Sequence, residues 1–113
     1  MDAKLMELAI HAQKGDMEAF SNLIMSFEQD LYRIASIRLK SADDIDDAIQ
    51  MTIEQSLKNI KRLRKPQFVK TWLIKILINN CNAIYKRKKK SIEYNDNIRL
   101  KAKDYNDEVN AKM

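Results

Sequence analysis

The chain has 113 residues, in which 21 Lys and Arg against 16 Asp and Glu give a net charge of +5. This length allows one compact domain, and a hydrophobic fraction of 45% excludes a charge-dominated disordered chain. One Gly and one Pro are too few for the turns of an antiparallel sheet or for a glycine-rich nucleotide-binding loop. The composition therefore predicts an all-α fold, a compact bundle of three to four helices.

The first forty residues predict a short helix followed by a long one. Lys14-Gly15 places a cation and then a C-terminal glycine at the end of the first helix, as helix C-termini favour. Asp16 is a typical N-cap residue for the second helix, which we expect to run to about Leu39. The apolar stripe of the second helix comprises Phe20, Leu23, Ile24, Phe27, Leu31, Ile34 and Ala35.

A third helix is predicted to begin after Ser41, because Ser41 followed by Asp44 approximates a capping box. Its inward positions are expected to be Ile45, Ala48, Ile49, Ile53, Leu57 and Ile60. This assignment leaves an outer face of Asp47, Gln50, Met51, Glu54 and Lys58. A methionine among polar neighbours suggests a contact surface, and the alternative is an ordinary solvated face.

The segment Lys61–Gln67 is predicted to be a loop, because Pro66 lacks a backbone donor and disfavours helical dihedrals at the preceding residue. Four of its residues are cationic: Lys61, Arg62, Arg64 and Lys65. A fourth helix is expected from about Gln67 to Lys88. Its apolar positions are Val69, Trp72, Leu73, Ile76, Leu77, Cys81 and Ile84.

Opposite that apolar arc, the fourth helix is predicted to carry a narrow polar ridge. The ridge consists of Lys75, Asn79, Asn82 and Lys86, with Trp72 at its edge one turn before Lys75. A cation suits a phosphate contact, an amide suits a base edge, and an indole suits base stacking. The alternatives are that Trp72 belongs to the core and that the two Asn side chains are only solvated.

The charges are segregated along the chain. Residues 1–57 contain 5 basic and 11 acidic side chains, whereas residues 58–90 contain 12 basic and no acidic ones. Such a block repels itself in the folded state, so a polyanion is the natural partner, with nucleic acid ahead of an anionic membrane.

Residues 91–113 are polar with weak periodicity, and we interpret them as a linker or tail following a domain of residues 1–90. A helix from about Ile98 to Ala111 is the alternative.

A single cysteine, Cys81, and a single histidine, His11, predict neither a disulfide nor a metal site, and no catalytic group or cofactor is expected. The single cysteine fits a reducing cytoplasm, and the longest uncharged run, Ile76 to Tyr85, is too short to span a membrane, so we expect a cytoplasmic protein.

Several segments in order resemble a known family. They are residues 12–16 (AQKGD) with Ala19-Phe20, residues 46–50 (DDAIQ), the pattern Phe68-x-x-Thr71-Trp72-Leu73-x-x-Ile76-x-x-Asn79, and the basic run that follows. The combination, over about residues 5–90, is similar to region 2 of bacterial sigma-70 factors of the extracytoplasmic-function (ECF) group. The resemblance implies an initiation factor that binds core RNA polymerase and helps to open promoters.

The resemblance also implies two binding surfaces. The third helix would dock on the clamp helices of the polymerase beta-prime subunit through Asp46, Asp47, Gln50, Met51 and Glu54. The loop and the last helix would bind the non-template strand of the promoter −10 element through Lys61, Arg62, Arg64, Lys65, Trp72, Lys75, Asn79, Asn82, Lys86 and Arg87. An anti-sigma factor is a further candidate partner, and no membrane partner is expected.

Three departures from the family pattern affect this interpretation. Met51 and Ile53 stand where the family commonly has Glu and Phe, and the loop Lys61–Gln67 is short and lacks the usual Gly. Nothing after Lys90 has the length or pattern of the family's second, helix-turn-helix domain, so we expect either an excised N-terminal domain or a naturally short relative. Two other hypotheses remain: a sigma-like protein-interaction module, and a general basic helical nucleic-acid binder.

Overall fold

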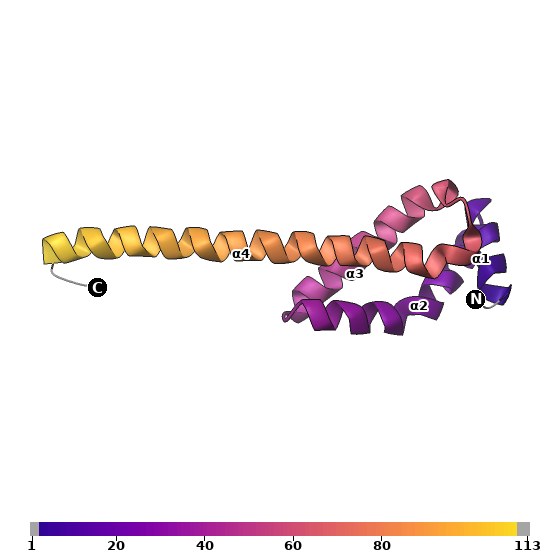
Figure 1. Ribbon diagram of the computed structural model, residues 1–113, viewed down its shortest axis with the longest axis horizontal. Helices are drawn as coiled ribbons and strands as arrows, with labels where there is room; N and C mark the ends of the chain where they lie inside the picture. The colour runs from indigo at the N-terminus through magenta and orange to yellow at the C-terminus, as the bar shows by residue number, and fades with distance from the viewer. Residues whose placement is uncertain (1–2, 111–113) are drawn as a thin grey trace. The chain divides into compact units, whose positions relative to one another are not determined.

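In the computed structural model, residues 3–110 are described for the backbone and residues 3–95 for the side chains. The described part is all helical, which confirms the predicted fold class (Figure 1). Its elements are α1 (Ala3–Gln13), α2 (Met17–Arg38), α3 (Ala42–Asn59), two 3-10 turns, η1 (Ile60–Arg62) and η2 (Pro66–Phe68), and α4 (Val69–Asn110).

The turn between α1 and α2 forms as the sequence predicts. Gly15 adopts a φ of 99°, a backbone conformation that side chains with a Cβ rarely adopt. Asp16 then caps α2, because its carboxylate accepts a hydrogen bond from the backbone N–H of Ala19 at 3.0 Å. The hydroxyl of Ser41 accepts from the N–H of Asp44 at 3.2 Å, so the predicted start of α3 is also confirmed.

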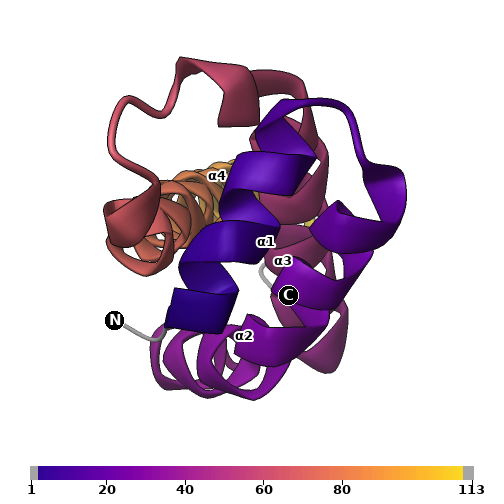
Figure 2. The same cartoon turned by 90° about the vertical axis from the view of Figure 1, so that its right-hand side faces the viewer.

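The chain forms two compact units, Met1–Ala83 and Ile84–Met113. In the first unit, α1 packs against α2 and against both 3-10 turns, and α3 packs against α2 and η1 (Figure 2). All four helices contribute buried apolar side chains to its core. They include Ala9, Ala12, Phe20, Leu23, Phe27, Leu31, Ala35, Ile45, Ala48, Val69, Leu73 and Leu77.

The buried face of α3 differs from the prediction. Leu57 was expected inside but is 42% exposed, and Ile49 and Ile53 are only half-buried. Thr52 and Ser56 are fully buried instead, because they share one face with Ile45 and Ala48 at helical spacing. Burial of these two hydroxyls is possible because each donates to a backbone carbonyl of its own helix, Thr52 to Ala48 and Ser56 to Ile53.

The last helix is also longer than predicted. We expected it to end near Lys88 and to be followed by a polar tail, but α4 continues to Asn110. No Gly or Pro interrupts residues 89–110, and Lys, Arg, Glu, Leu and Ala in that segment favour a helix even without an apolar face. The alternative helix beginning at Ile98 lies within α4, and Ala111 lies outside the described residues. The functional division between residues 1–90 and 91–113 stays a prediction.

Candidate nucleic-acid interface

The connection between α3 and α4 presents four cations on a structured loop. Lys61 and Arg62 belong to η1, Arg64 and Lys65 follow it, and all four side chains are exposed. The N–H of Leu63 donates to the carbonyl of Ile60 at 3.1 Å, which closes the η1 turn. Pro66 begins η2, in the position at the start of a helical turn where its missing N–H costs least. The predicted loop therefore has defined backbone turns.

A side chain from α1 holds this loop, and sequence reasoning missed it. The Nε2 of Gln13 donates to the carbonyl of Ile60 at 3.0 Å and to the carbonyl of Leu63 at 2.6 Å. Gln13 is the last residue of α1 and is half-buried. Gln13 lies in the AQKGD segment that carries the family resemblance, but nothing in the sequence near it indicates that its amide binds the carbonyls of Ile60 and Leu63. The contact joins residues far apart in sequence.

Phe68 is a second feature of the loop that the sequence analysis did not assign to DNA binding. Its side chain is 53% exposed, and the Nζ of Lys65 lies 6.0 Å from the centre of its ring. At this distance a cation–π attraction is weak but favourable. An exposed aromatic ring among cations can stack on an unpaired base while the cations bind phosphates. The connection between α3 and α4 thus carries groups suited to both kinds of contact.

The polar ridge on α4 lies on the surface of the first unit. Lys75, Asn79 and Asn82 are exposed, and on the opposite side of the helix Leu73 and Leu77 are fully buried. Trp72 is half-buried, which fits its predicted place at the edge of the ridge. The structure therefore brings the three ridge residues onto one exposed strip.

The basic run falls in the second unit. Lys86 and Arg87 are exposed there, as are Lys88, Lys89 and Lys90. Five successive helical residues span more than one turn, so their side chains point to every side of α4. This segment offers sequence-independent attraction to phosphates rather than a pattern for reading bases.

The outer face of α3 is the candidate protein-binding surface. Asp46, Asp47, Gln50 and Glu54 are exposed, and Met51 is half-buried. The side-chain amide of Gln50 donates to the Glu54 carboxylate at 3.2 Å, one helical turn away. Lys58, which the sequence also placed on this face, is exposed as well, so the face combines three carboxylates and one cation with an amide and a partly exposed thioether. Its excess of carboxylates suits a partner carrying cations.

Two side chains of α4, Asn80 and Lys70, make polar contacts with the other helices of the first unit. Asn80, which is buried, donates to Thr52 Oγ1 at 3.0 Å and to Gln55 Oε1 at 3.1 Å. Asp30 on α2 accepts from Lys70 at 3.3 Å and pairs with Arg33 at 2.7 Å. The hydrogen bond and the charge of Lys70, and then Arg33, hold the pKa of the Asp30 carboxyl below its ordinary value of 3.8.

The one cysteine of the chain, Cys81, is buried and free. Burial raises the pKa of the Cys81 thiol above its ordinary value of 9.0, despite the opposing charge of Arg38, so the nucleophilic thiolate is disfavoured.

Among the described residues, no group of His, Cys, Asp and Glu side chains could hold a metal ion. None of the helices in the described part is long and apolar enough to cross a membrane.

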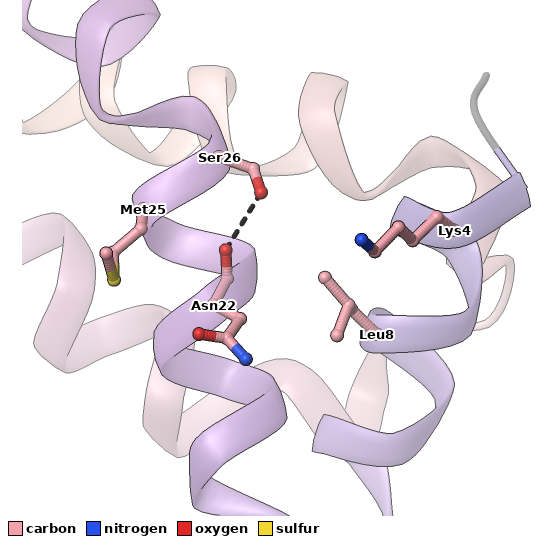
Figure 3. Close-up of a pocket in the computed structure, with 5 residues that line it drawn as sticks. All are labelled: Lys4, Leu8, Asn22, Met25 and Ser26. Carbon is pink, nitrogen blue, oxygen red and sulfur yellow. Dashed lines mark hydrogen bonds between the residues drawn. The ribbon is translucent and has the colours of Figure 1, made fainter.

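A surface pocket lies between α1 and α2, and its lining contains none of the predicted binding residues (Figure 3). Ser26 on its wall donates to the backbone carbonyl of Asn22 at 2.8 Å. The five lining residues are Lys4, Leu8, Asn22, Met25 and Ser26. The pocket is therefore separate from the loop, from the ridge and from the outer face of α3.

Comparison with known proteins supports the resemblance noted in the sequence. Residues 23–91 match the family described as Sigma-70 region 2. The RNA polymerase sigma factor SigV of Bacillus subtilis (strain 168) is 33% identical over 67 residues, which are 59% of this chain and 40% of that protein. The ECF RNA polymerase sigma factor SigM of Mycobacterium tuberculosis (strain ATCC 25618 / H37Rv) is 32% identical over 80 residues, 71% of this chain and 39% of that protein. The chain spans about two fifths of the length of these curated relatives. No solved structure matches it significantly.

Proposed function

The chain belongs to the sigma-70 region 2 family, in the ECF group, and from this premise we propose that it binds core RNA polymerase and opens promoter DNA at the −10 element. One observation carries the proposal. The first unit displays an acidic outer face on α3 and, on other elements, a cationic loop and an amide-bearing ridge. Two surfaces of opposite character fit a protein that joins a polymerase to a polyanion.

For the polymerase, we infer that the outer face of α3 docks on the clamp helices of the beta-prime subunit. The residues that would make this contact are Asp46, Asp47, Gln50, Met51 and Glu54, of which all but Met51 are exposed. Charge complementarity speeds encounter and fixes orientation, while the partly exposed Met51 adds apolar contact area. The departure from Glu to Met at position 51 changes part of this face from charged to apolar.

For the promoter, we infer that the loop and the ridge bind the displaced non-template strand. The loop would contribute Lys61, Arg62, Arg64 and Lys65, and the ridge Trp72, Lys75, Asn79 and Asn82. In the second unit, Lys86 and Arg87 would add phosphate contacts. The exposed ring of Phe68 supports the same proposal, because a stacking surface favours unpaired bases over a duplex.

Binding of this kind opens DNA without nucleotide hydrolysis. Extruding a base costs a few kcal/mol, and one stacking contact with several phosphate contacts returns about that much. Any ligand that binds the single strand better than the duplex shifts the equilibrium toward the open form. We therefore propose a binding function, with no catalytic group on the chain.

The experiment that tests the polymerase contact is titration of the full 113-residue chain with a purified beta-prime clamp-helix fragment, by calorimetry at moderate salt. Asp47→Arg reverses one charge on the outer face of α3 and should weaken binding at least tenfold. Glu28→Arg makes a similar reversal at an exposed position of α2 and should leave the affinity unchanged.

Three results would count against the proposal, two of them from this titration and the third from DNA binding. A folded wild-type chain that does not bind the fragment would remove the sigma-type polymerase contact and leave a general basic nucleic-acid binder. Wild-type affinity in Asp47→Arg would remove the outer face of α3 as the docking surface. Polymerase binding without any preference for single-stranded DNA would favour the alternative of a protein-interaction module.

A further inference from the structure

We propose that Gln13 is a positioning residue for DNA recognition, which shapes the cationic loop without touching DNA itself. Its amide donates to the carbonyls of Ile60 and Leu63 at 3.0 and 2.6 Å. These two carbonyls flank Lys61 and Arg62 in the sequence. The inference rests on the proposed function, because it assigns to Gln13 a role in the loop's discrimination between strands.

The η1 turn needs support from outside. A 3-10 turn of three residues has poor hydrogen-bond geometry, and such turns are stable only in short pieces held by their surroundings. Within η1 and its cap, the N–H of Leu63 donates to the carbonyl of Ile60 at 3.1 Å. Gln13 adds a second donor to that same carbonyl and a first to the carbonyl of Leu63. Its single amide therefore spans the whole turn.

Repulsion between the cations of the loop makes the hydrogen bonds from Gln13 more important for its shape. Lys61, Arg62, Arg64 and Lys65 place four cations within five residues, and their mutual repulsion favours a spread loop. Gln13 is neutral and half-buried, so it binds the backbone without neutralising the cations that DNA requires. A loop already held in one shape loses less entropy when it binds.

The expected effect is on sequence preference more than on general affinity. Attraction between cations and phosphates tolerates small displacements, whereas contacts to a base depend on position and angle. Release of the turn should therefore leave binding to an arbitrary strand nearly unchanged and weaken binding to the preferred strand. A residue that only stabilised the fold would lower both affinities together.

The test uses three variants of the full chain. Gln13→Met keeps the length of the side chain, removes both donors and adds no charge. Gln13→Glu replaces the donors by oxygen atoms that the two carbonyls repel. Gln29→Glu adds the same negative charge at an exposed position of α2 and serves as the control. The helical circular dichroism of each variant establishes that it is folded.

Two measurements are made on each protein. The first is the ¹⁵N relaxation order parameter of residues 61–63, which should fall from about 0.85 toward about 0.6 when the turn is released. The second is the ratio of affinities for a strand selected by the wild-type chain from a randomised single-stranded pool and for its scrambled version. We expect both Gln13 variants to lower this ratio roughly 3- to 10-fold, about the factor for one net hydrogen bond, and the control to preserve it.

The outcomes separate this inference from the function on which it rests. Wild-type order parameters or a wild-type affinity ratio in Gln13→Met would overturn the role of Gln13 and leave the proposed function intact. A wild-type chain for which no preferred strand can be selected would instead overturn the proposed promoter recognition, and the role of Gln13 in it.

Discussion

The side-chain amide of Asn80 on α4 donates to the hydroxyl of Thr52 on α3 at 3.0 Å, with both residues buried. Thr52 in turn donates to the carbonyl of Ala48 at 2.7 Å, and the Asn80 amide nitrogen also donates to Gln55 Oε1 at 3.1 Å. No buried side-chain nitrogen or oxygen in the described part lacks a partner. A satisfied polar contact in an apolar interface permits one register of α3 against α4.

The first prediction concerns this contact. Thr52→Val keeps the shape of the side chain but removes the hydroxyl, so Asn80 is left with an unpaired buried donor. We expect the free energy of unfolding to fall by about 1–3 kcal/mol. Urea denaturation measures the loss, and Thr52→Ser, which keeps the hydroxyl, should lose less. Equal stability of Thr52→Val and the wild-type chain would show that the contact contributes nothing.

The second prediction concerns pH and Asp30. Because Lys70 and Arg33 lower the folded-state pKa of this carboxyl below 3.8, its ionised form stabilises the fold above that value. The contribution is lost as the pH falls from 3.8 through the folded-state pKa. Asp30→Asn should therefore be less stable than the wild-type chain at pH 7, and the difference should close in acid.

Urea midpoints of both proteins at pH 7 and at several values below pH 4 measure this difference. Lys70→Gln removes the main partner and should reproduce most of the effect, with the same dependence on pH. A stability difference that persists unchanged in acid would mean that the ion pair is not its source.

The third prediction concerns Gly15. A Cβ at this position would meet no atom within 4 Å, so the cost of a substitution comes from the positive φ alone. Gly15→Ala should lower the free energy of unfolding by about 1–2 kcal/mol. Gly15→Asn should cost less, because asparagine tolerates the left-handed region better. An alanine variant as stable as the wild-type chain would contradict the assigned role of the turn.

The fourth prediction separates two roles on the ridge. Lys75→Ala should reduce the slope of log affinity against log salt by about 0.7, the value for one phosphate contact to a single strand. Asn79→Ala should leave that slope unchanged and lower the preference for the selected strand. The double variant should still bind polymerase. An equal loss of affinity for selected and random strands would indicate a general nucleic-acid binder.

The features that could be predicted from the sequence depend on neighbouring residues. Gly15, Asp16 and Ser41 act within three or four residues of their own positions, so the end of α1 and the starts of α2 and α3 were predictable. The spacing of Lys75, Asn79 and Asn82 likewise sufficed to place them on one exposed strip.

The features that could not be predicted depend on distant partners. Hydrophobicity favoured Leu57 over Thr52 for the interior of α3, whereas Thr52 is buried and receives a hydrogen bond from Asn80 on another helix, a partner that the sequence near Thr52 does not indicate. The AQKGD segment likewise includes Gln13 but does not indicate which distant carbonyls its amide binds. The continuation of α4 past Lys88 was not predicted for a different reason. The sequence analysis required an apolar face for a helix, but a polar segment without helix-breaking residues can extend a helix that packing has already started.

The reach of Gln13 also has a consequence for the order of folding. Its two acceptors lie 47 and 50 residues further along the chain, so the loop cannot acquire its held shape from the folding of its own segment. Closing so long a stretch of chain costs entropy that local helix formation does not repay. The cationic turn should therefore be among the last parts to form. A nascent or partly folded chain would then attract nucleic acid through its positive charge before it had any preference for one DNA sequence over another.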